Sequence, residues 1–148
     1  MTRVNTLDPK YLLDQHLLAE YKEITRIFGY SRDYGHRLST NDIPNEYVLG
    51  TGHVKFFSNK LKYCLYRYKK LQLELIIRGF HINPVSLKDL CEGIDKRLFE
   101  YWTPGAKARI TCADRIIDRL TNTKAPLKYK SELINLDEAI DITYKGLL

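Results

Sequence analysis

The stretch DQHLLAEYKEITRIFG, residues 14–29, combines the pattern of a buried helix face with many ionisable side chains. Asp8 followed by Pro9 predicts the start of a helix, and Gly29 predicts its end. We therefore expect a first helix over residues 9–28. Its apolar residues recur every three or four positions, the spacing of one helix face: Leu13, Leu17, Tyr21, Ile24 and Phe28.

Two further segments have the same helical period. One follows the glycines of LGTGHVKFF (residues 49–57) and runs to about Arg78, with basic residues such as Arg67 expected at its surface. The other runs from about Ala106 to Leu120. Short helical turns are predicted near residues 85–92 and 132–142, and alternating strand patterns hardly appear. The sequence therefore predicts an all-α fold, a single compact domain of three main helices with long connecting loops.

The composition indicates an ordered globular chain. With 148 residues and 44% hydrophobic residues, one domain over residues 1–148 can bury a core without disulfides or metals. No apolar run or leader indicates membrane insertion or export, so we expect no membrane contact and a cytoplasmic location in a bacterial or phage-infected cell. The widely spaced Cys64, Cys91 and Cys112 lack metal-ligand spacing, and we interpret them as reduced thiols.

The net charge narrows the class of partner. Lysine and arginine outnumber acidic residues and give a formal charge of +6. A basic surface favours polyanionic partners, most often nucleic acid. Charge alone does not decide this, because many basic proteins do not bind nucleic acid.

The first helix has an ionisable flank beside its apolar face. At about 100° per residue, His16, Glu23 and Arg26 fall in one strip, and Glu20 lies between that strip and the core side. A carboxylate at this boundary needs a charged or hydrogen-bonding partner. The strip is either a solvated flank with ordinary pairs along the helix, or the wall of a site.

The amino terminus, MTRVN, supplies a candidate nucleophile. A residue as small as Thr2 permits removal of the initiator methionine, which would leave a free α-amine. Such an amine has a pKa of about 8, so a substantial fraction is uncharged at neutral pH. Met-Thr starts are common, however, and by themselves carry no function.

Several segments together closely resemble the phage-type endonuclease V family of pyrimidine-dimer DNA glycosylases. The resemblance lies in MTRVN at the start, LLDQHLLAEYKEITRIFG over residues 12–29, LGTGHVKFF, LELIIRGFHI over residues 73–82, and EYWTPGAKARITCADRIIDRL over residues 100–120. It implies a monomeric helical repair enzyme, with no metal and no cofactor, that acts on double-stranded DNA containing ultraviolet lesions or abasic sites.

The resemblance also implies a mechanism. The Thr2 α-amine attacks C1′ of a cyclobutane pyrimidine dimer, forms an imine (Schiff base), and cleaves the backbone on the 3′ side by β-elimination. Glu23 assists, and the DNA is kinked with the adenine opposite the lesion extruded. Contact with DNA or substrate is implied for Arg3, Gln15, His16, Glu20, Lys22 and Arg26. We assign it also to Arg115, Arg119, Lys128 and Tyr129, although the two arginines would equally well solvate the third helix.

Two departures from the family pattern leave alternatives open. Lys22 stands where the family commonly has arginine, and a lysine loses the two-pronged phosphate contact. The aromatic cluster typical of the family's C-terminus is replaced by LKYKSE, and residues 130–148 form a divergent extension. The alternatives are a glycosylase or lyase for another lesion or for abasic sites, and a non-catalytic helical DNA-binding protein. His53 is expected to cap or orient the second helix.

Overall fold

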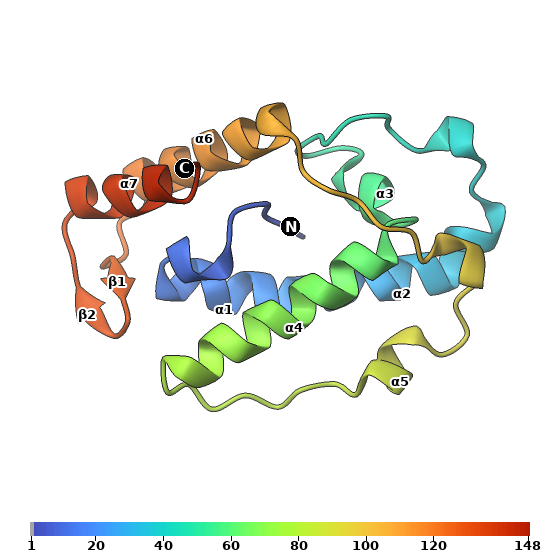
Figure 1. The fold of residues 1–148 in the computed structure, drawn as a ribbon, viewed down its shortest axis with the longest axis horizontal. Helices are drawn as coiled ribbons and strands as arrows, with labels where there is room; N and C mark the ends of the chain where they lie inside the picture. The colour runs from blue at the N-terminus through green and yellow to red at the C-terminus, as the bar shows by residue number, and fades with distance from the viewer. Residues whose placement is uncertain (1) are drawn as a thin grey trace.

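The fold is built almost entirely from helices (Figure 1). The computed structural model describes residues 2–148, and within this range no helix is both long and apolar enough to cross a membrane. The predicted helical class is confirmed, but the expectation of three main helices was too coarse. The helices are α1 (Asp14–Glu23), α2 (Thr25–Tyr34), α3 (His53–Phe57), α4 (Leu61–Ile77), α5 (Leu87–Cys91), α6 (Ala106–Asn122) and α7 (Leu136–Lys145).

The first predicted helix is divided into three parts. Residues 9–11 form a short 3-10 turn capped by Asp8, α1 begins only at Asp14, and α2 follows α1 after a single residue. Gly29 lies inside α2, so its prediction as a helix end was wrong. Burial of Ile27 and Phe28 on one face of α2 outweighs the cost of about 1 kcal/mol that glycine imposes within a helix.

The second predicted helix is also divided, because the helical conformation is interrupted between α3 and α4. Gly52, at a φ of 95°, makes the turn that starts α3. At the break, the Ser58 hydroxyl donates to the Lys55 carbonyl (2.6 Å) and the Lys60 ammonium to the Phe56 carbonyl (2.8 Å). These side chains satisfy carbonyls that a continuous helix would have paired. The break therefore leaves few unpaired polar groups.

The core lies between α1, α2 and α4. All five residues predicted for the buried face of the first helix are buried, with Tyr21 the most exposed at 7%. The ring of Tyr21 stacks on Tyr68 of α4, with centroids 5.0 Å apart and planes 7° from parallel. Their hydroxyls are hydrogen-bonded at 3.1 Å, so the polar end of each ring also has a partner.

A buried ion pair joins α1 to α4. Glu20 is 0% exposed, and its carboxylate accepts two hydrogen bonds from Arg67, from Nε at 2.7 Å and from Nη2 at 3.0 Å. The prediction that Arg67 lies at the surface was therefore wrong. Burial lowers the pKa of Arg67, but the adjacent Glu20 carboxylate outweighs this and raises it overall. The Arg67 guanidinium consequently remains charged within the core.

The C-terminal segment packs against the rest of the chain. Helix α7 runs alongside α6 (Figure 1), and its Ala139 and Thr143 are buried. Before it, β1 (Lys128–Tyr129) and β2 (Glu132–Leu133) form a small antiparallel hairpin. The helix predicted near residues 132–142 therefore begins later, at residue 136, where Asn135 and Glu138 form a capping box.

We expect Arg67→Met to lower the free energy of unfolding by about 3 kcal/mol or more, because it leaves the Glu20 carboxylate buried without its partner. Chemical denaturation of Arg67→Met, of Glu20→Gln and of the double variant measures the coupling between the two residues. As a control, Arg97→Met removes the exposed pair with Asp95 and should cost at most about 1 kcal/mol. Equal losses of unfolding free energy in Arg67→Met and Arg97→Met would contradict a larger contribution of the buried pair.

Candidate active site

The segment before α1 is held along its length by hydrogen bonds from distant parts of the chain. We call residues 2–8 the N-terminal arm. Val4 N–H donates to Nε2 of His53 (2.9 Å), and the Val4 carbonyl accepts from the hydroxyl of Tyr47 (3.0 Å). The Asn5 carbonyl accepts from the hydroxyl of Tyr63 (2.9 Å). The backbone of the arm is therefore held at Val4 and Asn5 by side chains from residues 47–63.

The side chain of Asn5 connects the arm to two helices. Its Nδ2 donates to Oε1 of Glu20 at 2.6 Å, and its Oδ1 accepts from Nη2 of Arg115 at 2.9 Å. Arg115 also donates to the Tyr47 hydroxyl at 3.4 Å. Since Glu20 is paired with Arg67, the arm is linked to α1, α4 and α6 by one continuous network. Arg115, predicted to contact DNA or solvate its helix, here supports the arm.

The N-terminal end of the arm lies beside the carboxylate of Glu23. The backbone N–H of Arg3 donates to Glu23 Oε2 at 3.0 Å, and the guanidinium Nε of Arg3 lies 3.9 Å from the same oxygen. Thr2 precedes Arg3 directly, so the first residue that the structure describes lies beside this carboxylate. Met1, whose removal the small Thr2 permits, lies outside the described residues. The two predicted catalytic residues are thus brought together.

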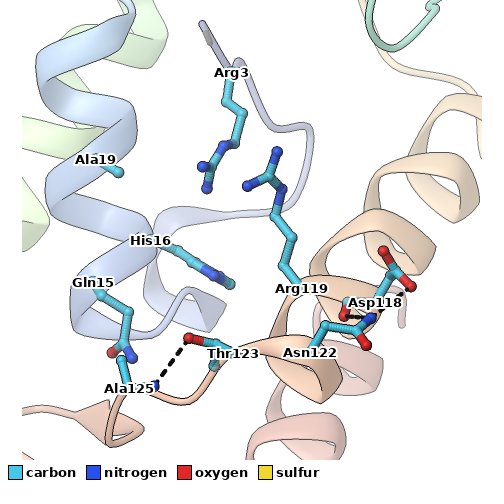
Figure 2. Close-up of a pocket in the computed structure, with 9 residues that line it drawn as sticks. All are labelled: Arg3, Gln15, His16, Ala19, Asp118, Arg119, Asn122, Thr123 and Ala125. Atoms are coloured by element: carbon cyan, nitrogen blue, oxygen red, sulfur yellow. Dashed lines mark hydrogen bonds between the residues drawn. The ribbon is translucent and has the colours of Figure 1, made fainter.

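A cleft of about 460 Å³ opens between α1, α6 and the arm (Figure 2). Arg3 and Arg119 point toward one another across it, and the His16 ring extends from α1 beneath them. Its walls bring together several predicted DNA contacts from distant segments. The lining residues are Arg3, Gln15, His16, Ala19, Asp118, Arg119, Asn122, Thr123 and Ala125.

His16 is electrically neutral at physiological pH in this cleft. Burial, together with the positive charges of Arg3, Arg119 and Arg115, lowers its pKa to about 4. Its Nδ1 is buried and has no hydrogen-bond partner among the residues of the 2–148 range. Burial and Arg119 also lower the pKa of Arg3, while Glu23 opposes this. The cleft therefore concentrates cationic charge around an uncharged imidazole, an environment that favours an anion.

A second hollow, of about 440 Å³, lies along α1 and has Glu23 among its lining residues. Gln15 and Ala19 line both hollows, so the two share one wall of α1. Lys22 and Arg26 line the second hollow and are exposed. Glu23 consequently shares this hollow with two cationic side chains, and its carboxylate lies 3.9 Å from the Arg3 guanidinium.

Two predicted roles change in the structure. Glu20 was expected to contact DNA or substrate, but it is completely buried and its oxygens bind Asn5 and Arg67. His53 was expected to cap or orient α3, but its ring connects Val4 with the Val48 carbonyl, which lies 2.7 Å from Nδ1. Both residues position the arm. The sequence marked Glu20 as a boundary carboxylate that needs a partner and His53 as a polar residue at a helix start, but neither signal identifies the distant partner.

Two predicted contacts lie away from Glu23, in the C-terminal hairpin. The hydroxyl of Tyr129 donates to the Lys10 carbonyl at 2.8 Å, and its ring faces the guanidinium of Arg78 at 4.9 Å. The backbone N–H of Lys128 donates to Gln15 Oε1 at 3.2 Å, next to the cleft. Contact of either side chain with DNA stays a prediction.

The described residues contain no group of three or more His, Cys, Asp or Glu side chains that could hold a metal ion. Residues 1–87 match the family model described as pyrimidine dimer DNA glycosylase. The chain belongs to this family. The match covers more than half of the chain and includes the arm, α1 and most of the arm's supports. This pyrimidine-dimer glycosylase family member is accordingly a DNA repair protein, and its substrate is DNA.

The arm should loosen in acid, because burial lowers the pKa of His53 to about 4. The folded state favours neutral His53, so its stabilisation is complete above about pH 6.5 and is lost as pH falls toward 4. His53→Gln, which cannot titrate, should remove on the order of 2 to 3 kcal/mol of this pH dependence. Urea unfolding at pH 7, 5.5 and 4 measures it. Identical pH profiles for the variant and the natural protein would refute the assignment.

Proposed function

We propose that this protein is a glycosylase with coupled abasic-site lyase activity, whose nucleophile is the α-amine of Thr2 after removal of Met1. The observation that carries the proposal is the hydrogen bond from the Arg3 amide to Glu23 at 3.0 Å. It holds the residue that would bear the amine against a carboxylate, as nucleophilic catalysis with proton transfer requires.

The surroundings favour a reactive amine. An α-amine has an unperturbed pKa of about 8, already well below that of lysine. Arg3 is adjacent in the chain, and Arg119 faces Arg3 across the cleft (Figure 2). Neighbouring positive charges disfavour the ammonium form and increase the uncharged fraction. Glu23 opposes this by its own charge, so its contribution is better understood as positioning and proton transfer than as activation.

The first chemical step replaces the glycosidic bond. The amine lone pair forms a bond with C1′ while the bond from C1′ to the base nitrogen breaks, and that electron pair leaves with the base, which is protonated. Glu23 stabilises the positive charge that develops at C1′. The amine then loses a proton, and the bond from C1′ to O4′ opens with protonation of O4′. The product is an imine between Thr2 and C1′.

The second step breaks the strand. Loss of a proton from C2′ is easy because the protonated imine accepts the electron pair. Elimination then forms the C2′–C3′ double bond and expels the 3′ phosphate, and water finally hydrolyses the imine to regenerate the amine. Glu23, which accepts a hydrogen bond from the Arg3 amide, would move these protons. One nucleophile thus serves both reactions.

The cationic cleft supports the binding part of the proposal. Two guanidinium groups that face one another create a positive potential in the cleft, which a DNA phosphate would complement. Lys22 and Arg26, which line the second hollow with Glu23, would hold phosphates of the same strand. The charges therefore flank the proposed nucleophile, where backbone contacts can position a kinked duplex.

Borohydride trapping tests the nucleophile. Protein whose start at Thr2 is verified by mass spectrometry should form a covalent adduct with dimer-containing duplex, and N-terminal acetylation should abolish both the adduct and strand cleavage. Glu23→Gln should lower the adduct yield by at least about tenfold, since a proton-transfer group typically contributes 10²–10⁴ in rate. Thr2→Ser is the matched control, because it keeps a small first residue and a free amine. Cleavage by the acetylated protein would refute the proposal.

A second candidate is a lyase that acts mainly on abasic sites. It is favoured by the C-terminal hairpin, where LKYKSE replaces the family's aromatic cluster. Asp14 accepts from the backbone N–H groups of Lys130 (3.0 Å) and Ser131 (2.7 Å), and Tyr129 is engaged by Lys10 and Arg78. These contacts hold the hairpin to the start of α1 and occupy its only aromatic side chain.

Strand cleavage of matched duplexes distinguishes the two candidates. If the protein excises dimers, duplexes with one dimer and with one abasic site should be cut within about tenfold of each other at equal enzyme concentration. A preference of more than about a hundredfold for the abasic duplex would assign the protein to the second candidate. Borohydride should trap both substrates on the same residue, because both reactions would use the Thr2 amine.

A further inference from the structure

A third hollow, a cavity of about 390 Å³, lies between α4, the N-terminal arm and the segment before α6. It shares no lining residue with the two hollows beside Glu23. Four of its ten lining residues are aromatic and two are basic, a combination that the proposed reaction does not use. The lining residues are Thr6, Asp8, Tyr63, Tyr66, Arg67, Lys70, Tyr101, Trp102, Thr103 and Pro104.

The aromatic side chains form a supported platform. Tyr66 and Tyr101 are 54% and 65% exposed, and their rings lie 6.0 Å apart and 21° from parallel. Behind them, Trp102 packs edge-on against Tyr63 at 5.0 Å and against Phe56 at 5.1 Å. Exposed rings over a rigid aromatic base offer a face on which another planar group can stack.

Polar groups of the cavity are suited to a charged ligand. The Thr6 side chain is buried, at 8% exposure for the residue, and its Oγ1 has no hydrogen-bond partner within residues 2–148. A buried hydroxyl without a partner is unfavourable unless a ligand or water supplies one. Lys70 lines the same cavity. Lys62 is outside the lining, but its ammonium lies 4.6 Å from the centre of the Tyr101 ring. Asp8 adds a carboxylate, whose Oδ1 accepts from the Lys10 N–H at 3.0 Å and whose Oδ2 can accept from a ligand.

We infer that this cavity binds one unstacked nucleotide. The base stacks on Tyr66 and Tyr101, Asp8 and Thr6 accept hydrogen bonds from its amino group or sugar, and Lys62 and Lys70 bind the phosphate. Free phosphate would leave the rings unused, and an uncharged aromatic ligand would leave the lysines unused. The carboxylate of Asp8 favours bases with an exocyclic amino group, so adenine should bind better than thymine.

Two sources present this chemistry, a free mononucleotide and an unpaired stretch of DNA. The site is separate from Glu23, and its existence does not depend on the proposed reaction. If the source is single-stranded DNA, the protein has a second nucleic-acid contact outside its active site. Neighbouring nucleotides would then add contacts, so an oligonucleotide should bind much more tightly than a mononucleotide.

Fluorescence of Trp102, the one tryptophan of the sequence, reports on the cavity directly. Titration with deoxyadenosine monophosphate should change the emission saturably, more tightly than thymidine monophosphate or inorganic phosphate does. A short single-stranded adenine oligonucleotide provides the second source. At least about tenfold tighter binding of the oligonucleotide assigns the site to unpaired DNA, and similar affinities assign it to free nucleotides. Equal binding of phosphate and nucleotide would overturn the proposal, because it would indicate a simple anion site.

Substitutions test whether the nucleotide binds in this cavity. Tyr66→Ala should weaken nucleotide binding by at least about fivefold, the lower range for loss of one base stack. Thr6→Val should also weaken it. Tyr144→Ala, an equally exposed tyrosine outside the cavity, should leave the affinity unchanged. Cleavage of a short lesion-containing duplex by Tyr66→Ala should stay normal. Unchanged nucleotide binding by Tyr66→Ala would overturn the inference without affecting the proposed function.

Discussion

The buried pair of Glu20 and Arg67 connects the parts of the molecule that matter for its chemistry. Two charges in a core are costly unless each is fully paired, and here Glu20 accepts from Arg67 twice and from Asn5 once. Arg67 also donates to the Leu7 carbonyl. The same requirement that keeps the charges satisfied thus fixes the arm at Asn5 and Leu7 against α1 and α4. The hydrogen bond from the Arg3 amide to Glu23 then holds the end of the arm that would carry the proposed nucleophile.

The arrangement separates positioning from contact with substrate. Asn5, Glu20, His53 and Arg115 support the arm from inside, while Glu23 and the cationic residues face the hollows along α1. A nucleophile on a chain end loses much conformational freedom when it is ordered, and prior fixation of the arm reduces that cost at the moment of reaction. Neutral His16 between arginines adds a polar surface without competing for the anion.

Much of this could be predicted from the sequence. The apolar spacing of the first helix placed all five core residues correctly, because an amphipathic period reflects burial directly. Helix ends were less predictable. Gly29 is a helix breaker by propensity, but packing of its neighbours overrides that preference, and the break after α3 depends on local side-chain hydrogen bonds. The pairing of Thr2 with Glu23 came from resemblance, and the fold brings the two together.

The sequence by itself determined the helical class, the amphipathic face of α1, the basic character of the chain and the family to which it belongs. These follow from local spacing and composition, which are readable along the chain. Only the tertiary structure decided that Glu20 and Arg67 are buried, that His53 holds the arm, and that Tyr66, Tyr101 and Thr6 line one cavity. Each of these depends on contacts between segments tens of residues apart. Residue type and periodicity do not encode such contacts, because a polar residue near an apolar face is equally compatible with solvent and with a distant partner.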